Sequence, residues 1–480
     1  MDLAMVKDTE SGSHKQVAAG GSRWRSGWFI ALAVISFLVL RSEHVLSVPA
    51  DFENPEMIRT GLAILAAIAV LWLSEALPLA ATAVMVPVLA ALTGVMDVAS
   101  GFANFAHPLI FLFLGGFALA AGLARHSLDR WLAQGALRLG KGHFYRTAAI
   151  LFGIAAVLSM WISNTAATAM LVPVALGIRA TLIAADGQEA ATRTTPFLLL
   201  GLAYSASIGG LGTVIGTPPN AIAAAKLGLS FTDWLAIGLP CVALLLPALF
   251  LMLLVVLHPG KVGAIKIVHE NLKMTGQAWG MLVLFVAVLT CWLFSRQLAD
   301  FFGVTKHFDS LIAVAAIGAM AATRLVGWRD IEKTTDWGVL LLFGGGLTLS
   351  KILSTTQASL YLANSVRDVT AGWPLIAFVG VLVLFVIFLT ELSSNTATTA
   401  LLAPIFASVA IDMGVEPARL VLPLAVASSC AFMLPVATPP NAIVFSSGLI
   451  QQKQMMRAGV VLNLVFAALL TLLSSWLFGR

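Results

Sequence analysis

Two short polar sequences each occur twice in this apolar chain, and they carry most of the chemistry that the sequence offers. Ser-Asn-Thr stands at residues 163–165 and again at 394–396, and Thr-Pro-Pro-Asn stands at 217–220 and again at 438–441. A polar triplet inside an apolar segment is energetically costly, so each copy predicts a functional site. Because both motifs recur in the same order, once in each half, the chain is predicted to contain an internal repeat.

The side chains of serine, asparagine and threonine suit them to the start of a helix. Their oxygens accept hydrogen bonds from the free backbone N–H groups of the first helical turn. We therefore expect the first triplet to cap a half-helix that begins near Ala166, and the second to cap one near Ala397. The paired prolines donate no hydrogen bond and hold the chain extended, so we expect them to end a helix and leave carbonyl groups free.

A helix that is interrupted in the middle of a membrane offers two kinds of ion site. The exposed amide end carries partial positive charge and suits an anion, whereas the exposed carbonyl end suits a cation. No lysine or arginine stands beside either triplet. An anion bound there would be neutralised by hydroxyls, amides, helix ends and bound cations. This predicts a cation-coupled anion carrier rather than a pore lined by basic side chains. Neutral oxygens favour Na⁺ over Ca²⁺ or Mg²⁺.

The sequence does not decide the roles of two carboxylates near these elements. Glu391 lies just before the second triplet, and Met160 takes the matching position in the first half. Glu391 either pairs elsewhere in the protein interior or adds negative charge near one ion. Glu75 is either a buried functional carboxylate or, as is commoner, a residue near the membrane interface.

The composition indicates the environment in which these motifs must work. The chain has 480 residues, of which 59% are hydrophobic and 11% are charged. Soluble domains have about 25% charged residues, so we predict an all-α integral membrane protein in contact with the lipid bilayer. The net charge of +5 reflects basic cytoplasmic loops and predicts no nucleic-acid partner. The cysteines lack metal-ligand spacing and are expected to be apolar fillers: Cys241, Cys291 and Cys430.

The order of apolar and polar stretches predicts about 11 transmembrane helices plus two re-entrant hairpins, with helices broken at mid-membrane. The hairpins are expected at 105–124 and 337–349, where Gly115-Gly116 and Gly344-Gly345-Gly346 lie within apolar runs. Close packing of helices would explain these glycines equally well. The predicted segments are a disordered cytoplasmic tail (1–23), a first span with an external loop (24–58), repeat 1 (59–257), a cytoplasmic linker (258–276) and repeat 2 (277–480).

The repeated motifs, together with Trp-Leu-Ser-Glu-Ala-Leu-Pro at 72–78 and the glycine-containing stretch at 337–347, resemble the divalent anion/sodium symporter family. This family comprises bacterial and animal di- and tricarboxylate carriers, and the likeness extends over nearly the whole chain after the tail. The resemblance implies two repeats of inverted topology and a homodimer in the cell's inner (plasma) membrane. It also implies a static scaffold region and a transport region that moves as an elevator.

The resemblance further implies which residues bind the ions and the substrate. The first Na⁺ site would use Ser159, Ser163, Asn164 and Gly212, and the second would use Thr390, Ser393, Asn395 and Ala437. The substrate carboxylates would contact Ser163, Asn164, Thr165, Ser394, Asn395 and Thr396, with Thr213 and Thr438 nearby.

The function expected first is Na⁺-coupled import of a C4-dicarboxylate such as succinate, malate or fumarate. A Na⁺-independent dicarboxylate exchanger and a symporter of inorganic sulfate are the alternatives. An intramembrane protease would need a serine–histidine pair or paired aspartates at depth. Most histidines fall in loops or interfaces, and His107 approaches a predicted hairpin without an evident nucleophile. We therefore expect that the protein is not an enzyme.

Overall fold

A computed structural model of the chain describes residues 13–46, 48–49, 52, 54–260, 262, 274–304, 306–370 and 372–476, with the backbone alone for helical residues 13–26, 133–138 and 476. Every regular element in these ranges is a helix. Seven of the described helices are long and apolar enough to cross a membrane, and shorter apolar helices accompany them. Because lipid offers no hydrogen-bond partner to the backbone, apolar runs of this length must fold as helices. The prediction of an all-α integral membrane protein is confirmed.

The first half of the chain folds into ten α-helices and three short 3₁₀ helices. They are α1 (Ser13–Arg41), α2 (Pro55–Ser74), α3 (Leu79–Leu92), α4 (Val98–Phe102), η1 (Ala103–Ala106), α5 (Pro108–Arg125), α6 (Leu128–Leu137), η2 (Arg138–Gly140), α7 (Phe144–Ser159), α8 (Asn164–Gly209), η3 (Gly210–Gly212), α9 (Pro218–Leu227) and α10 (Phe231–Leu257).

The described part of the second half is built from α11 to α21. These helices are α11 (Gly276–Leu293), α12 (Ser295–Phe302), α13 (Phe308–Ala322), α14 (Trp328–Thr334), α15 (Trp337–Thr355), α16 (Ala358–Val369), α17 (Leu375–Thr390), α18 (Asn395–Asp412), α19 (Ala418–Ser428), α20 (Pro439–Ser446) and α21 (Gln452–Trp476).

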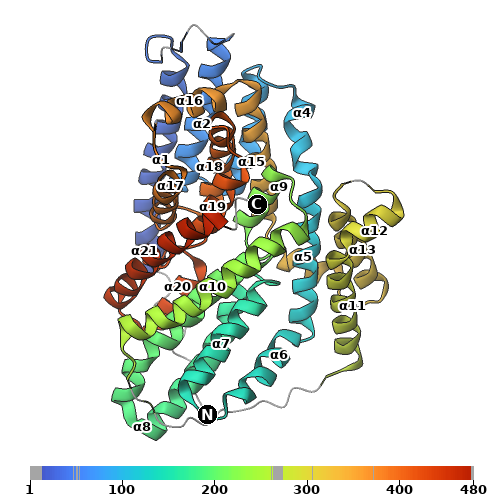
Figure 1. Ribbon diagram of the computed structural model, residues 1–480, viewed down its shortest axis with the longest axis vertical. Coiled ribbons are helices and arrows are strands. Elements are labelled where there is room, and N and C mark those ends of the chain that lie inside the picture. Colours follow the sequence, from blue (N-terminus) through green and yellow to red (C-terminus); the bar gives the residue numbers. More distant parts are fainter. Residues whose placement is uncertain are drawn as a thin grey trace.

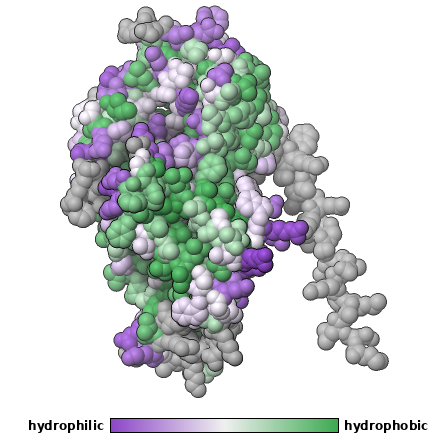
Figure 2. Space-filling view, turned by 90° about the vertical axis from the view of Figure 1, so that its right-hand side faces the viewer, coloured by the Kyte–Doolittle hydropathy of each residue, from purple (hydrophilic) through white to green (hydrophobic). Residues whose placement is uncertain are grey.

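The molecule is elongated, with α1, α2 and α16 at one end and the turn of α8 at the other (Figure 1). Helices α11, α12 and α13 form a group at one side, next to α5. Large apolar side chains are exposed on the outer faces of several helices, among them Leu251 and Val255 of α10 and Val283 of α11. Figure 2 shows broad apolar areas on one face of the molecule. Such surfaces suit contact with lipid rather than water.

The order of elements confirms that the chain contains a repeat. In each half a helix ends before Ser-Asn-Thr, a second helix begins within the triplet, and a later helix begins at Pro-Pro. The long helix α8 contains a kink at Gly187, where φ is 84° and ψ is 173°. Its two parts therefore match the separate helices α18 and α19 of the second half.

The two predicted hairpins are wrong. Gly115-Gly116 lies inside α5 and Gly344-Gly345-Gly346 lies inside α15, and both helices are continuous over 18 and 19 residues. These glycines serve close packing instead. A Cβ atom on Gly115 would lie 2.9 Å from Cα of Ala313 in α13, and one on Gly345 would lie 2.8 Å from Cα of Ala83 in α3. Small residues let helix backbones approach closely without any reversal of the chain.

Other segments expected to be irregular are partly helical. Helix α1 begins at Ser13, so it includes the second part of the stretch predicted as a disordered tail, whereas residues 1–12 lie outside the described residues. Extending a helix is easier than starting one, so a polar stretch can continue an apolar helix. Residues 181–195, a more polar stretch, are helical except at Gly187. Most of the predicted linker at 258–276 lies outside the described residues.

Candidate functional site

Each Ser-Asn-Thr triplet interrupts a helical run and starts a new helix, as predicted. Helix α8 begins at Asn164, and Oγ of Ser163 accepts a hydrogen bond from the N–H of Ala166 at 3.2 Å. Helix α18 begins at Asn395, and Oγ of Ser394 accepts one from the N–H of Ala397 at 3.4 Å. The serine alone is the capping residue in each triplet. The asparagine and threonine belong to the first helical turn and do not cap it.

The two Thr-Pro-Pro-Asn sequences stabilise a second pair of breaks, which we call break 1 (residues 213–217) and break 2 (residues 429–438). In break 1, Nδ2 of Asn220 donates to the carbonyls of Gly210 and Thr213, both at 2.8 Å. In break 2, Nδ2 of Asn441 donates to the carbonyls of Ala431 and Leu434, at 3.2 and 3.0 Å. The partners stand ten and seven residues before the asparagine in both halves, so each asparagine holds its break in the same way.

The prolines have a different role from the one expected. They do not end the preceding helix; they stand at the start of α9 and α20, in the first helical turn. A proline suits this position because its missing N–H would have no partner inside the helix. Of the carbonyls before each pair of prolines, those of Gly210, Thr213, Ala431 and Leu434 are not free, because they accept hydrogen bonds from the two asparagines.

In the first half, side chains connect the triplet to break 1. The hydroxyl of Thr213 donates to the carbonyl of Met160 at 2.6 Å, and the hydroxyl of Ser159 donates to Oδ1 of Asn164 at 2.5 Å. Ser159 and Thr213 are fully buried. These contacts fix the end of α7 against the loop that precedes α9.

In the second half, the carboxylate of Glu391 makes this connection. Its oxygens accept hydrogen bonds from the backbone N–H groups of Phe432, Met433 and Leu434 at 2.7, 2.9 and 3.1 Å. Nδ2 of Asn463 in α21 donates to the same carboxylate at 2.8 Å. Glu391 is only 3% exposed. The sequence left two roles open for Glu391, pairing in the protein interior or adding charge near an ion. The structure shows the first, because Glu391 has hydrogen-bond partners inside the protein, three of them in break 2.

Both triplets and both breaks line one large cavity of about 1090 Å³. The predicted site residues that line it are Ser163, Asn164, Thr165, Ser394, Asn395, Thr396, Ala437 and Thr438. The predicted residues that do not line it are Ser159, Gly212, Thr213, Thr390 and Ser393. Among these, the hydroxyl of Thr390 donates to the carbonyl of Ile387 at 3.0 Å, and Ser393 lies 2.9 Å from the hydroxyl of Thr398. The fold therefore brings both triplets, Ala437 and Thr438 to the cavity wall and leaves the other five predicted residues outside its lining.

Sequence reasoning missed Thr217 and Gly216, which line the cavity in the first half. A signal for them was present. When the two Thr-Pro-Pro-Asn copies are aligned, Thr217 matches Thr438 and Gly216 matches Ala437, whereas Thr213 matches Leu434. Thr217 is thus the repeat counterpart of Thr438, and Thr213 supports the break from behind.

The charged residues of the cavity lie apart from the triplets in the sequence. They are Glu75, Asp129, Lys333 and Asp336, so Lys333 is the one basic residue among the described residues that line the cavity. Asp129 stands in α6, outside the candidate membrane spans, and burial raises the pKa of its carboxyl group. No cluster of three acidic, histidine or cysteine side chains that could hold a metal occurs in the described ranges. The oxygens of the triplets themselves belong to neutral hydroxyl, amide and backbone groups.

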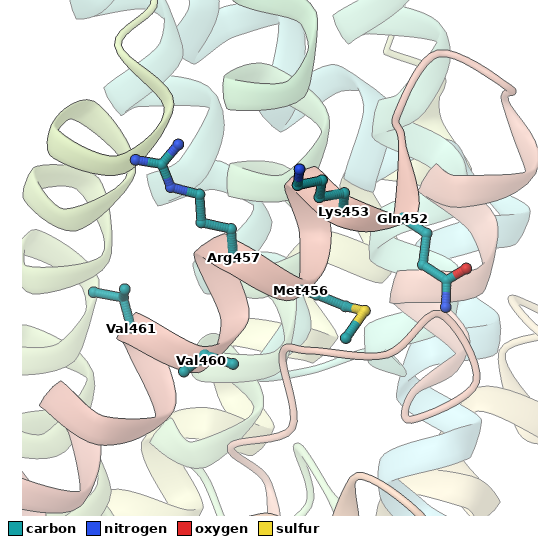
Figure 3. A pocket seen from close by; sticks show the side chains of 6 residues that line it. All are labelled: Gln452, Lys453, Met456, Arg457, Val460 and Val461. Atoms are coloured by element: carbon teal, nitrogen blue, oxygen red, sulfur yellow. The ribbon is translucent and has the colours of Figure 1, made fainter.

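A second hollow lies on the surface at the start of α21 (Figure 3). It measures about 670 Å³ and is lined by Gln452, Lys453, Met456, Arg457, Val460 and Val461, all from this one helix. Lys453 and Arg457 extend to the same side of the helix in the close-up view. Because neither repeated motif contributes to this groove, we do not place the functional site there.

Known proteins resemble this chain over most of its length. Residues 28–479 match the family described as the sodium:sulfate symporter transmembrane region. An uncharacterized transporter of Haemophilus influenzae is 44% identical over 449 residues, which cover 92% of this chain and 95% of the relative. A protein of Staphylococcus aureus named sodium-dependent dicarboxylate transporter SdcS is 36% identical over 444 residues, which cover 86% and 84% of the two chains.

A solved structure has the same fold. The YdaH transporter of Alcanivorax borkumensis superposes with a TM-score of 0.56 over 96% of this chain and 100% of its own, at 14% sequence identity. The family match is to membrane transporters, which also confirms the expectation that the protein is not an enzyme. Given the repeated motifs, the shared cavity and these matches, the chain belongs to the sodium:sulfate symporter family, that is, to the divalent anion/sodium symporters.

Proposed function

We propose that this protein imports a C4-dicarboxylate such as succinate, malate or fumarate together with Na⁺. The observation that carries the proposal is the meeting of two helix starts, each with a Ser-Asn-Thr triplet, in one cavity. A helix start attracts an anion through its free N–H groups and its dipole. Two such starts in one cavity suit a substrate with one carboxylate at each end.

The substrate would contact the side chains of both triplets together with Thr217 and Thr438. Thr165 is exposed, and Asn164, Asn395 and Thr396 are half-buried in the cavity wall. Their side chains could contact the substrate, because the serines rather than these residues cap the helices. Neutral donors bind a dianion without the cost of a basic side chain at membrane depth, roughly 2.5–3.5 kcal/mol for each lysine or arginine.

Sodium ions would bind beside the triplets and offset the charge of the substrate. The first site would use oxygens of Ser159, Ser163, Asn164 and Gly212, and the second those of Thr390, Ser393, Asn395 and Ala437. Oδ1 of Asn395 is buried and has no hydrogen-bond partner among the described residues, which fits a cation ligand. Sodium dependence is also named for the relatives from Staphylococcus.

The cellular setting belongs to the same proposal. Basic residues near the first span and in the 258–276 segment favour an N-terminus in the cytoplasm and insertion in the plasma membrane. Two inverted repeats, 59–257 and 277–480, would form a protomer of a homodimer. The part that carries the triplets would move through the membrane as an elevator and expose the cavity to each side in turn.

The test is uptake of radiolabelled succinate into proteoliposomes that contain the purified protein. An inward Na⁺ gradient should stimulate uptake, and an equal K⁺ gradient should not. Counterflow of succinate in sodium-free buffer would instead identify an exchanger. Because the family description names sulfate, unlabelled sulfate is the second competitor. Stronger competition by sulfate than by malate or fumarate would refute the dicarboxylate assignment.

A further inference from the structure

The two halves of the chain differ in charge at the position of Glu391. The residue at the matching position of the first half is Met160. Glu391 is 3% exposed, and each of its four hydrogen bonds is donated to it. An ionised carboxylate can only accept hydrogen bonds, so this set of partners suits the charged form.

The backbone explains why break 2 needs a carboxylate and break 1 does not. After α8 the chain continues as the 3₁₀ helix η3 over Gly210–Gly212, and helical hydrogen bonds use the N–H groups there. After α19 the chain is irregular over 429–438, so the N–H groups of 432–434 have no helical partner. Three successive free N–H groups form a concave anion-binding surface. Glu391 fills that surface from within the protein.

The opposite side of this segment is also fixed. The hydroxyl of Tyr204 donates to the carbonyl of Phe432 at 2.6 Å, and Nδ2 of Asn441 donates to the carbonyls of Ala431 and Leu434. Donors on α8 and α20 thus bind the carbonyls of this segment, and Glu391 accepts hydrogen bonds from its N–H groups. Ala437 and Thr438, which stand three and four residues after Leu434, form part of the cavity wall.

We propose that Glu391 is a positioning residue that fixes the conformation of break 2 and makes its cation site stronger than that of break 1. The second part of this proposal, the effect on Na⁺, rests on the proposed function. Buried charges interact across a low dielectric, so a carboxylate bonded to the backbone of break 2 attracts a cation bound by the same loop. Break 1 has no such charge, because Met160 is apolar and only its carbonyl oxygen participates.

The first experiment measures the conformation and needs neither Na⁺ nor substrate. Hydrogen–deuterium exchange of the purified protein should be faster over 429–438 in Glu391→Gln and faster still in Glu391→Met, which installs the residue of the first half. Exchange over 210–217 should stay unchanged. Glu416→Gln, the same change on an exposed loop between α18 and α19, is the matched control. Unchanged exchange over 429–438 in both Glu391 variants would overturn the proposal.

The second experiment measures the ion. In proteoliposomes, Glu391→Gln should raise the Na⁺ concentration for half-maximal succinate uptake about tenfold, the equivalent of one charge-assisted hydrogen bond. The KM for succinate at saturating Na⁺ should change less than threefold, and Glu416→Gln should match the wild type. A merely structural loss would lower the maximal rate and leave the Na⁺ dependence intact. That outcome would overturn the second part of the proposal, a stronger cation site at break 2.

A milder variant covers the case in which Glu391→Gln does not fold. Asn463→Ala removes one donor to the carboxylate and leaves the charge and the three backbone contacts in place. It should raise exchange over 429–438 by a smaller factor and shift the Na⁺ dependence about two- to threefold. No change in either measurement would count against the proposal. If wild-type uptake itself ignores Na⁺, the proposed function fails, whereas the exchange experiment still decides whether Glu391 positions break 2.

Discussion

Break 1 and break 2 are built from the same motif but stabilised by different groups. In both, an asparagine of Thr-Pro-Pro-Asn binds two carbonyls, and a pair of prolines starts the next helix. The backbone N–H groups before the prolines have different partners in the two halves. In the first half they belong to the 3₁₀ helix η3, and in the second half they donate to the carboxylate of Glu391. The comparison teaches that the motif residues in the cavity wall correspond closely between the halves, whereas the residues behind them, such as Met160 and Glu391, do not.

The largest expected effect comes from removing the symmetric side chains that face the cavity. Asn164→Ala and Asn395→Ala should each abolish Na⁺-driven succinate uptake, because each removes a polar group from the start of a helix that would bind substrate and ion. Expression and oligomeric state should stay as in the wild type, as judged by size-exclusion chromatography. Wild-type uptake by either variant would remove that residue from the site.

The next largest effect, a loss of stability, is expected when either of the two asparagines that hold the breaks is replaced. Asn220→Leu and Asn441→Leu each leave two buried carbonyls without their donor, which should cost about 2–4 kcal/mol of stability. We expect a lower melting temperature for both variants in a thermal unfolding assay. Similar losses would support equal roles for the two asparagines. A loss confined to one variant would show that the breaks are not held in the same way.

A smaller effect distinguishes residues in the cavity wall from those behind it. Thr217→Ala and Thr438→Ala should raise the KM for succinate by about three- to tenfold, because each would lose the hydrogen bond to the substrate that we propose. Thr213→Val loses the contact with Met160 and should lower stability by about 1 kcal/mol without a comparable change in KM. The reverse pattern, with Thr213 affecting KM and Thr217 not, would restore the assignment first made from sequence.

The smallest effect is expected for Lys333, the basic residue among the described residues that line the same cavity. Lys333→Gln should raise the KM for succinate about twofold at low ionic strength, because a basic group in the cavity attracts an anion from solution. The difference should fade as salt rises, since a solvent-exposed charge is screened over about 10 Å at 0.1 M. A large effect that persists at high salt would place Lys333 in direct contact with the substrate.

Sequence reasoning located the triplets, their helix starts and the repeat because these depend on local chemistry. A serine before a helix caps it wherever the helix goes, and the N-caps at Ser163 and Ser394 follow from this. The glycine runs were ambiguous, because the same residues permit a turn or a close helix contact. Their partners, such as Ala83 and Ala313, are remote in sequence and could not be foreseen.

The role of Glu391 lies at the limit of what the sequence can tell. Its position before the triplet was evident, but its partners stand 41, 42, 43 and 72 residues further along the chain. Only the fold brings these groups together. Thr217, in contrast, needed no tertiary information, because aligning the repeated motif identifies it.

The glycine contacts restrict which helices can slide past each other. Gly345 lies against Ala83, and Gly115 lies against Ala313, so closely that neither glycine has space for one more carbon atom. Displacing either pair by a helical turn, about 5.4 Å, would bring a larger side chain, such as Leu349 or Leu119, to the spot the glycine occupies. Helices α3 and α15 should therefore keep their relative position during any conformational change, and so should α5 and α13. Sliding between helices would have to occur at other interfaces.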